Sequence, residues 1–315
     1  MTYRMIARAC TALAAVVLSC GIAAAQTYGF VTLQPGSLNH TTASSIAKVL
    51  KEKAGMNVLV QPTAGDTAII PMVGRGEAEI GISNIMEAQA GFDGAFKDFR
   101  LITAVHALRT PFFVRKDSPI RKTEDMRGKK VAWGYSAMRV LDTVTRAMIA
   151  TGGLTEADVQ PVPVPNVVRG ADDFVAGAND AFFFAFGAPK IREVDATVGG
   201  IRAIETDEKG MPAARRIMHW GYLTQVAPGP VFTGVDRPMK IYSFDNVLFT
   251  NAKVPDATIY KILETLEKNH GDLVAVQPVL REFTPAFGYK KYGVPYHNAA
   301  LKFFKDRNLE PRALD

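Results

Sequence analysis

Small polar residues gather in three loops of this chain, two of them between an apolar strand pattern and a helix pattern and one directly after a third apolar strand. These loops offer hydroxyls, side-chain amides, glycines and one carboxylate, which can hold a small molecule through hydrogen bonds but include no catalytic group. The loop residues are Gly36, Ser37 and Asn39, then Thr63, Asp66 and Thr67, and finally Ser83 and Asn84. In an open parallel sheet, loops after the carboxyl ends of strands line a ligand crevice. Backbone N–H groups at the helix starts favour an anionic ligand there.

Strand and helix patterns alternate along the chain, which predicts an α/β protein with mostly parallel sheets. Early strands are expected at 28–34, 57–61 and 78–82, with helices at 43–53 and 68–74. A second series begins after residue 111, with a strand at 129–133, a loop, a helix at 137–150 and a strand at 180–184. A Pro- and Gly-rich loop at 226–240 precedes a strand at 242–250 and helices at 256–270 and 298–307.

The order of these elements predicts two lobes connected by two chain crossings. Lobe 1 is expected from residues 26–107 together with 248–315, and lobe 2 from the inserted residues 108–247. The loops at the strand ends of both lobes would then face one cleft. Lobes of this kind close around a ligand by hinge motion.

The first 25 residues predict export to the periplasm. A basic start, a short apolar run over 12–22 and alanines at 23–25 indicate a signal peptide that is cleaved after Ala25. Both cysteines, Cys10 and Cys20, lie in this segment, and a mature chain without thiols suits an oxidising compartment. Residues 17–20 also faintly resemble a lipoprotein cleavage box, which leaves lipidation of Cys20 as an alternative.

Composition and motifs argue against several other classes of protein. The formal net charge is +6, but the basic residues are dispersed among acidic ones, so we expect no nucleic-acid partner. The sequence has no Gly-x-Ser-x-Gly, His-Glu-x-x-His or phosphate-binding Gly-Lys-Ser/Thr motif. Its five histidines are scattered, without a spacing that would ligate a metal. We therefore expect a monomeric binding protein that is not an enzyme and has neither metal nor cofactor.

The motifs, in their order and spacing, resemble the TAXI family of solute receptors for TRAP transporters over essentially the whole mature chain. The matching segments are Gly36-Ser37 with the following helix, 60–65, 76–82, 127–131, 180–189 and 293–300. The resemblance implies a two-lobed type II periplasmic-binding-protein fold, in which each lobe is a mostly parallel sheet flanked by helices and the ligand cleft lies between the lobes. It also implies a partner, a separate TRAP membrane permease subunit driven by an ion gradient.

Three loops depart from the family pattern. The first continues with Leu38-Asn-His-Thr-Thr42 where Gly-Thr-Tyr-Tyr is usual, and the second has Ala64-Gly-Asp66 for Gly-Gly-Ser. The third has Gly134-Tyr-Ser-Ala-Met-Arg139 for Pro-Gly-Ser-Gly-Thr. Members of the family are associated with glutamate, glutamine and 2-oxoglutarate-like dicarboxylates. Because the loops differ, we expect only the broader class of ligand, a small carboxylate or an amino acid.

Three charged residues lie near the predicted cleft, and two of them have alternative interpretations. Arg139 is expected in the first turn of a helix capped by Ser136, where it either pairs with a ligand carboxylate or is exposed or paired with Asp142. Asp66 is either the N-cap of the second helix or a partner for the ammonium group of an amino-acid ligand. Arg109 lies at the expected hinge, beside His106, which is interpreted as structural.

Placement alone adds further residues to the predicted ligand site. They are Tyr135 and Ser136 in the loop at 134–139, Phe184 and Gly187 at a strand exit, and Tyr222 beside the long loop. The resulting hypothesis is an extracytoplasmic solute receptor that captures a small organic anion for a TRAP transporter. The alternative is a periplasmic sensory protein that presents its ligand to a signalling receptor.

Overall fold

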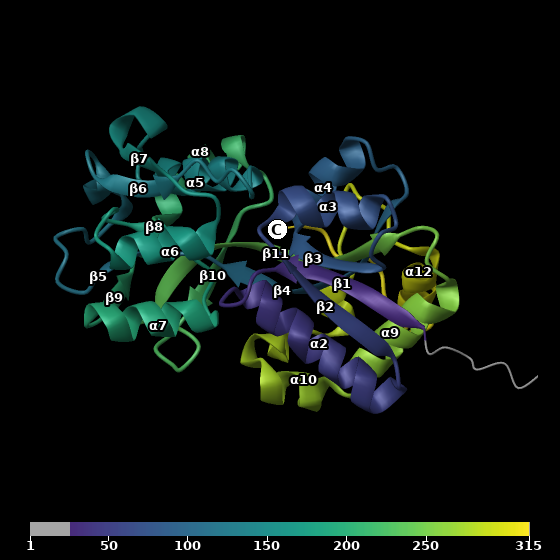
Figure 1. Ribbon diagram of the computed structural model, residues 1–315. Coiled ribbons are helices and arrows are strands. Elements are labelled where there is room, and N and C mark those ends of the chain that lie inside the picture. Colours follow the sequence, from purple (N-terminus) through teal and green to yellow (C-terminus); the bar gives the residue numbers. More distant parts are fainter. Residues whose placement is uncertain (1–25, 315) are drawn as a thin grey trace, which may run out of the picture.

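The computed structural model describes residues 26–314. The predicted signal peptide, both cysteines and the cleavage position therefore lie outside the described residues. Figure 1 shows two groups of elements, with β4, β10 and β11 between them. We call the group that contains β1, β2 and β3 the first lobe and the group that contains β5 to β9 the second lobe. The predicted two-lobed α/β fold is confirmed.

The first lobe is organised around a mixed sheet of six strands. Their order is β10-β11-β3-β1-β2, and β4 also pairs with β11. These strands are β1 (Thr27–Leu33), β2 (Asn57–Thr63), β3 (Ile80–Asn84), β4 (Phe99–Arg109), β10 (Tyr222–Val226) and β11 (Met239–Asn251). β1 is parallel to β2 and β3, whereas β11 is antiparallel to β3, β4 and β10. The parallel strands bring the three polar loops to one edge, as predicted.

Seven helices belong to the first lobe among the described residues. They are α2 (Leu38–Ala54), α3 (Asp66–Gly74), α4 (Ile85–Asp93), α9 (Asp256–Lys268), α10 (His270–Val276), α11 (Pro285–Gly288) and α12 (Asn298–Lys305). α2 begins five residues before its predicted start, because the Ser37 hydroxyl accepts a hydrogen bond from the His40 N–H at 3.1 Å and caps the helix. It ends at Gly55, whose φ of 65° allows the left-handed C-cap.

The second lobe contains two small sheets. An antiparallel sheet in the order β8-β5-β9 is formed by β5 (Phe112–Arg115), β8 (Phe182–Phe183) and β9 (Ile201–Ala203), and the parallel pair is β6 (Lys130–Trp133) with β7 (Gln160–Pro163). Its helices are α5 (Val140–Ala150), α6 (Val167–Val175), α7 (Pro189–Val198) and α8 (Met211–Ile217). The prediction of a mostly parallel sheet therefore describes β6 and β7 but not the β8-β5-β9 sheet.

The long strands β4 and β11 connect the lobes and pair from Ser243 opposite Arg109 to Asn251 opposite Phe99. Because side chains alternate along a strand, Leu108 and Phe244 line the cavity between the lobes, while Arg109 and Asp245 line a cavity on the opposite face. The predicted lobe boundaries at 107 and 248 fall within these strands and stay a prediction. Within 26–314, no helix has the length and apolar character of a membrane span.

Candidate functional site

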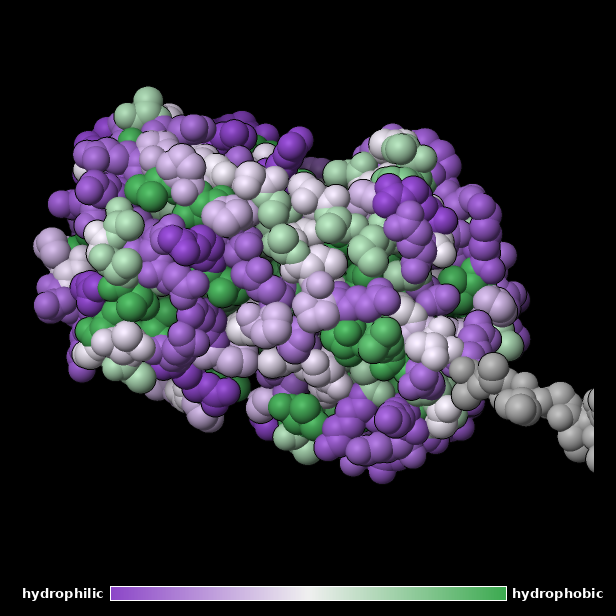
Figure 2. Space-filling model, in the orientation of Figure 1, coloured by the Kyte–Doolittle hydropathy of each residue, from purple (hydrophilic) through white to green (hydrophobic). Residues whose placement is uncertain are grey.

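A small cavity of about 50 Å³ lies between the lobes, at the carboxyl ends of the parallel strands. Its volume is far below the roughly 300–1,000 Å³ of typical small-molecule pockets. The cavity is lined by Leu33, Ser37, Leu38, Asn39, Ser83, Asn84, Leu108, Thr110, Met138, Leu141, Val167, Phe183, Phe184, Ala185 and Phe244. The site is therefore mostly apolar, with a few polar groups, and its walls are closed onto each other. In Figure 2 hydrophilic residues cover much of the outer surface, and paler residues of intermediate hydropathy occupy the junction between the lobes.

Direct contacts between the lobes hold this closed arrangement. The Gln34 amide donates to Asn166 at 2.8 Å, and both the N–H and the hydroxyl of Thr67 donate to the Ala137 carbonyl at 3.2 Å. The Lys190 N–H donates to the Gly36 carbonyl at 3.2 Å. A ligand of ordinary size can enter only when these contacts break and the lobes move apart.

Four helices begin at the wall of the cavity. Ser37 and Asn84 are the N-caps of α2 and α4, and Asn84 accepts the Glu87 N–H at 3.0 Å. Val167, the first residue of α6, also lines the cavity, as does Leu141 in the first turn of α5. Helix N-termini offer unpaired backbone N–H groups and a positive dipole end, which together favour an anion.

A chain of hydrogen bonds fixes the orientation of Asn39. Burial lowers the pKa of His106 to about 4, so the ring is neutral, and its Nδ1–H donates to the Ala107 carbonyl at 3.1 Å. Nε2 of His106 must then accept, which it does from the Asn246 amide at 3.2 Å. The same amide donates to Oδ1 of Asn39 at 3.0 Å. The backbone carbonyl thus sets the tautomer, and the tautomer sets the direction of the Asn39 NH₂ group.

Asn39 and Asn84 each leave an amide NH₂ group without a protein acceptor in the described part of the chain. Asn39 uses its oxygen for Asn246, and Asn84 uses its oxygen for the Glu87 N–H. The hydroxyl of Ser37 donates to the Gln34 carbonyl at 2.8 Å, and that of Thr110 donates to the Tyr242 carbonyl at 3.3 Å. The free side-chain groups at the cavity are therefore donors, which suit a ligand rich in acceptors.

No charged side chain lines the cavity within residues 26–314. Arg139 is exposed and is the N-cap residue of α5, so the predicted helix start at Ala137 and the capping role of Ser136 are wrong. The reason is Asp142, whose carboxylate accepts the N–H groups of Gly134 and Tyr135 at 2.9 and 3.3 Å and folds the preceding residues into turns. Within residues 26–314 the side chains of Asp142 and Arg139 form no ion pair; the two residues share only a backbone hydrogen bond, from the Asp142 N–H to the Arg139 carbonyl at 3.3 Å.

Asp66 does not cap α3, contrary to the N-cap interpretation. Gly65 is the N-cap residue, and Asp66 is the first helical residue, with its carboxylate buried and hydrogen-bonded to the Ser83 hydroxyl. Ser83 lines the cavity, but Asp66 does not. Thr67 lies at the contact with Ala137 instead of at the cavity wall. The second predicted loop thus contributes to lobe contact more than to the cavity.

The other predicted residues occupy several environments. Phe184 lines the cavity, whereas Tyr135 is buried in the core, where its hydroxyl donates to the Ala132 carbonyl at 3.1 Å. Thr63 donates to the Thr32 carbonyl at 3.0 Å. Gly36 lies in the turn before α2, with a φ of 91°. Gly187 lines a separate groove of about 750 Å³, and a Cβ there would lie 2.7 Å from Val279.

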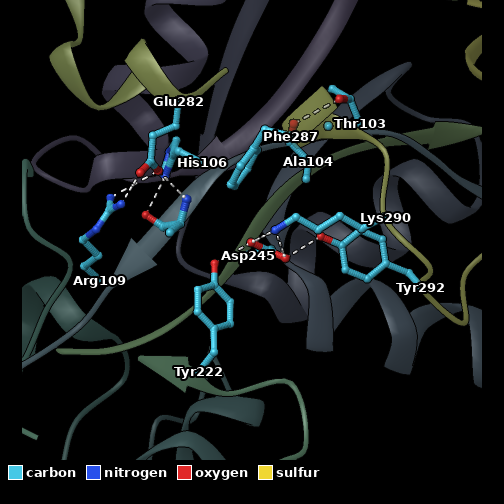
Figure 3. A network of polar contacts seen from close by, with 12 residues as sticks. Thr103, Ala104, His106, Arg109, Tyr222, Asp245, Glu282, Phe287, Lys290 and Tyr292 are labelled. Carbon is cyan, nitrogen blue, oxygen red and sulfur yellow. Dashed lines mark hydrogen bonds and ion pairs between the residues drawn. The ribbon is translucent and has the colours of Figure 1, made fainter. Parts of the chain in front are cut away.

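Arg109 and Tyr222 belong to a polar network behind the cavity (Figure 3). Arg109 is ion-paired with Glu282, which also accepts the Ala107 N–H at 3.0 Å. Both carboxylate oxygens of Asp245 accept hydrogen bonds. Lys290 Nζ donates to each oxygen at 2.8 Å, and the hydroxyls of Tyr222 and Tyr292 donate to one oxygen each, at 2.7 and 2.6 Å. Burial and the Asp245 charge raise the pKa of both tyrosines, so their hydroxyls stay protonated donors.

Sequence reasoning missed the cavity residues that come from the crossing strands. Leu108, Thr110 and Phe244 line the cavity but lie in β4, just after it and in β11. Their period-two alternation with Arg109 and Asp245 was the available signal. Nothing in the sequence indicated Met138, which lines the cavity from the segment before α5. Among the described residues there is no cluster of three or more His, Cys, Asp or Glu side chains that could hold a metal ion.

Three solved structures illustrate the similarity of the fold. A periplasmic transporter structure is 15% identical, with a TM-score of 0.58, covering 91% of this chain and 94% of the other. The amino acid ABC transporter substrate-binding protein AbpA from Streptococcus pneumoniae, bound to L-arginine, is 13% identical with a TM-score of 0.51, covering 81% and 94%. The alkanesulfonate-binding protein SsuA from Xanthomonas axonopodis pv. citri, bound to MOPS, is 14% identical with a TM-score of 0.50, covering 91% and 95%.

At these identities the solved structures establish the two-lobed fold of substrate-binding proteins and nothing finer. The sequence itself matches one family model over residues 35–307, which extends from the first polar loop to just beyond α12. On that match, the chain belongs to the NMT1-like family.

Proposed function

We propose that the protein is an extracytoplasmic solute receptor that binds a small organic anion with an apolar body. The free NH₂ groups of Asn39 and Asn84 in a mostly apolar wall carry this proposal. A carboxylate or a sulfonate presents only acceptors and matches these donors and the helix N-termini. A zwitterionic amino acid is the poorer match, because its ammonium group would find no carboxylate in the cavity lining that the structure describes.

The delivery step is also a proposal. The resemblance to TAXI receptors and the predicted signal peptide support a periplasmic monomer that passes its ligand to a TRAP membrane permease subunit. Genes for a TRAP permease beside the coding gene would agree with this assignment. Genes for an ATP-binding-cassette permease in that place would reject the TRAP partner, and a receptor gene for signal transduction would favour the sensory alternative; both would leave anion binding intact.

A thermal-shift screen tests the ligand class. The panel contains short-chain and branched carboxylates, oxo-acids, aromatic acids, alkanesulfonates, dicarboxylates, amino acids and neutral sugars. We expect monoanions with an apolar body to raise the melting temperature most, because binding to the native state alone stabilises it. Stabilisation by neutral sugars alone would contradict the anion proposal.

Asn84→Asp is expected to abolish binding of the anion found in that screen. Aspartate is as good an N-cap as asparagine, so α4 should keep its start. The new carboxylate replaces the NH₂ donor by a like charge at the cavity wall, and like charges at an interface cost several kcal/mol, or about 100-fold or more in affinity. Calorimetric titration measures the loss.

Asn84→Ser is the matched control, since serine is a neutral N-cap that lacks only the amide. We expect it to bind more weakly than the natural protein but clearly more tightly than Asn84→Asp. Equal affinities of the natural protein and Asn84→Asp would place the anion elsewhere.

Arg139→Ala should change the affinity for that anion by less than about 1 kcal/mol, as is typical of exposed charge pairs. The side chain is exposed and does not line the cavity. The predicted clasp of a ligand carboxylate by this arginine would instead give a loss of about 2–5 kcal/mol, as for a desolvated charge pair that loses one member. Titration of the variant distinguishes the two roles.

A further inference from the structure

Two buried carboxyl groups lie beside each other under the contact between the lobes. Asp66 is 1% exposed at the start of α3, and Glu87 is 8% exposed in the first turn of α4. Each has one oxygen, Oδ2 of Asp66 and Oε1 of Glu87, without a hydrogen-bond partner in the part of the chain that the structure covers. Neither group lines the ligand cavity.

The cover over this carboxyl pair comes from the second lobe. Thr67, next to Asp66, donates twice to the Ala137 carbonyl, and the Val140 N–H lies close enough to Glu87 to act on its carboxyl group. A Cβ on Gly65 would lie 2.1 Å from the Ala137 oxygen, so the two lobes are in backbone contact here. Separation of the lobes would uncover this contact and let water reach Glu87.

The surroundings set only neutral donors against the negative charge. The Ser83 hydroxyl lowers the pKa of Asp66 and the Val140 N–H lowers that of Glu87, but each effect is smaller than the rise caused by burial. In the first lobe, α3 contributes Asp66, α4 contributes Glu87, and β3 contributes the neutral side chains of Ser83 and Asn84. Among the described residues, Asp66 is the one charged group whose charge raises the pKa of Glu87. On the side of the second lobe, Arg139 is exposed, and Asp142 is bound to the N–H groups of Gly134 and Tyr135. Two ionised carboxylates in this position would be both desolvated and mutually repelling.

From this geometry we infer that Glu87 and Asp66 form a proton-binding site that must hold a proton for the two lobes to close. The receptor then takes up a proton together with its ligand. The inference concerns closure itself and does not depend on which ligand occupies the cavity.

The direction of the pH effect follows from where the proton is held more tightly. In the closed form, burial and then the Asp66 charge raise the pKa of Glu87 from 4.5 to about 9, and burial raises the pKa of Asp66 from 3.8 to about 6. When the lobes part, water reaches Glu87 and its pKa falls back toward the ordinary value. Between the ordinary and the raised pKa of Glu87, the closed form therefore binds one more proton than the open form. The ratio of closed to open protein should then fall by about tenfold for each unit of increase in pH.

Small-angle X-ray scattering of the ligand-free protein from about pH 5 to about pH 9 tests the inference, since this window spans the raised pKa values. We expect the radius of gyration to increase with pH, as the closed form gives way to the open one. Glu87→Gln mimics the protonated acid, so this variant should stay compact across the range. Asp93→Asn, at an exposed position in the same helix, should behave like the natural protein.

Two outcomes of the pH series would overturn the inference. One is a radius of gyration that does not change with pH in the natural protein, and the other is a Glu87→Gln variant that opens at the same pH as the natural protein. The alkaline measurement is made once in choline chloride and once in sodium chloride, which tests whether a sodium ion can occupy the carboxyl pair in place of the proton. Closure by sodium ions would assign the carboxyl pair to a metal cation instead of a proton.

Discussion

Lys290→Met is expected to lower the free energy of unfolding by about 3–5 kcal/mol, the range for removing one member of a buried ion pair. Lys290 and Asp245 have side chains that are 10% and 4% exposed, and Nζ lies 2.8 Å from each carboxylate oxygen. Methionine keeps an unbranched apolar side chain of nearly the same length, one heavy atom shorter than lysine, but loses Nζ, which now lies 4.1 Å from the centre of the Phe287 ring. The Asp245 charge would remain buried with only the hydroxyls of Tyr222 and Tyr292 as donors.

Urea unfolding of the variant and the natural protein measures this change. Lys268→Met is the matched control, because Lys268 pairs with Glu264 one helical turn away and its side chain is 65% exposed. Such an exposed pair contributes about 0.3–0.5 kcal/mol. Adding Asp245→Asn to Lys290→Met should restore part of the loss, because the uncompensated charge is then gone. Equal decreases in the free energy of unfolding for Lys290→Met and Lys268→Met would show that the buried ion pair stabilises the fold no more than an exposed one.

The ion pair also bears on the ligand cavity, although it lies on the other face of the crossing strands. Asp245 stands between Phe244, which lines the cavity, and Asn246, which orients Asn39. Anchoring Asp245 from behind therefore fixes the neighbours on either side. Loss of the anchor should weaken ligand binding as well as stability, even though no atom of Lys290 lines the cavity between the lobes.

The sequence predicted the part of the site that local patterns encode. Ser37, Asn39, Ser83 and Asn84 line the cavity because parallel strands end at one edge, and a strand-loop-helix pattern reveals that edge without knowledge of any long-range contact. The two-lobed α/β fold was accessible for the same reason, since alternating strand and helix periods are local signals.

Specific side-chain and backbone contacts of the folded chain decided what the sequence could not predict. Asp66 looked like an N-cap, but the Ser83 hydroxyl and the close approach of Ala137 turned its carboxylate inward and left Gly65 to cap the helix. Ser136 looked like an N-cap too, but Asp142 folds the residues before Arg139 into turns. In the first case partners from other elements overrode the residue's local preference, and in the second case a carboxylate in the next helix did so.

Gly65→Ala should keep the protein folded but prevent the lobes from closing. The φ of Gly65 is 168°, an extended conformation open to any residue, so alanine introduces no backbone strain. In the closed form, however, its Cβ would lie 2.1 Å from the Ala137 oxygen and 2.8 Å from Met138 Cγ. The backbone oxygen cannot move aside as a flexible side chain could, so the clash is relieved only when the lobes separate.

We expect this variant to have the larger radius of gyration of the open form even at about pH 5, where the proton site that includes Glu87 would be filled. Its affinity for the anion should fall by about 100-fold, because overpacking a well-packed contact costs up to about 3 kcal/mol in the typical case. The free energy of unfolding measured in urea should fall by only about 1 kcal/mol, the typical difference between a favourable N-cap residue and alanine. Gly271→Ala is the control, because a Cβ there meets no atom within 4 Å. A Gly65→Ala protein that closes and binds like the control would show that the contact between Gly65 and Ala137 is not part of the ligand-bound state.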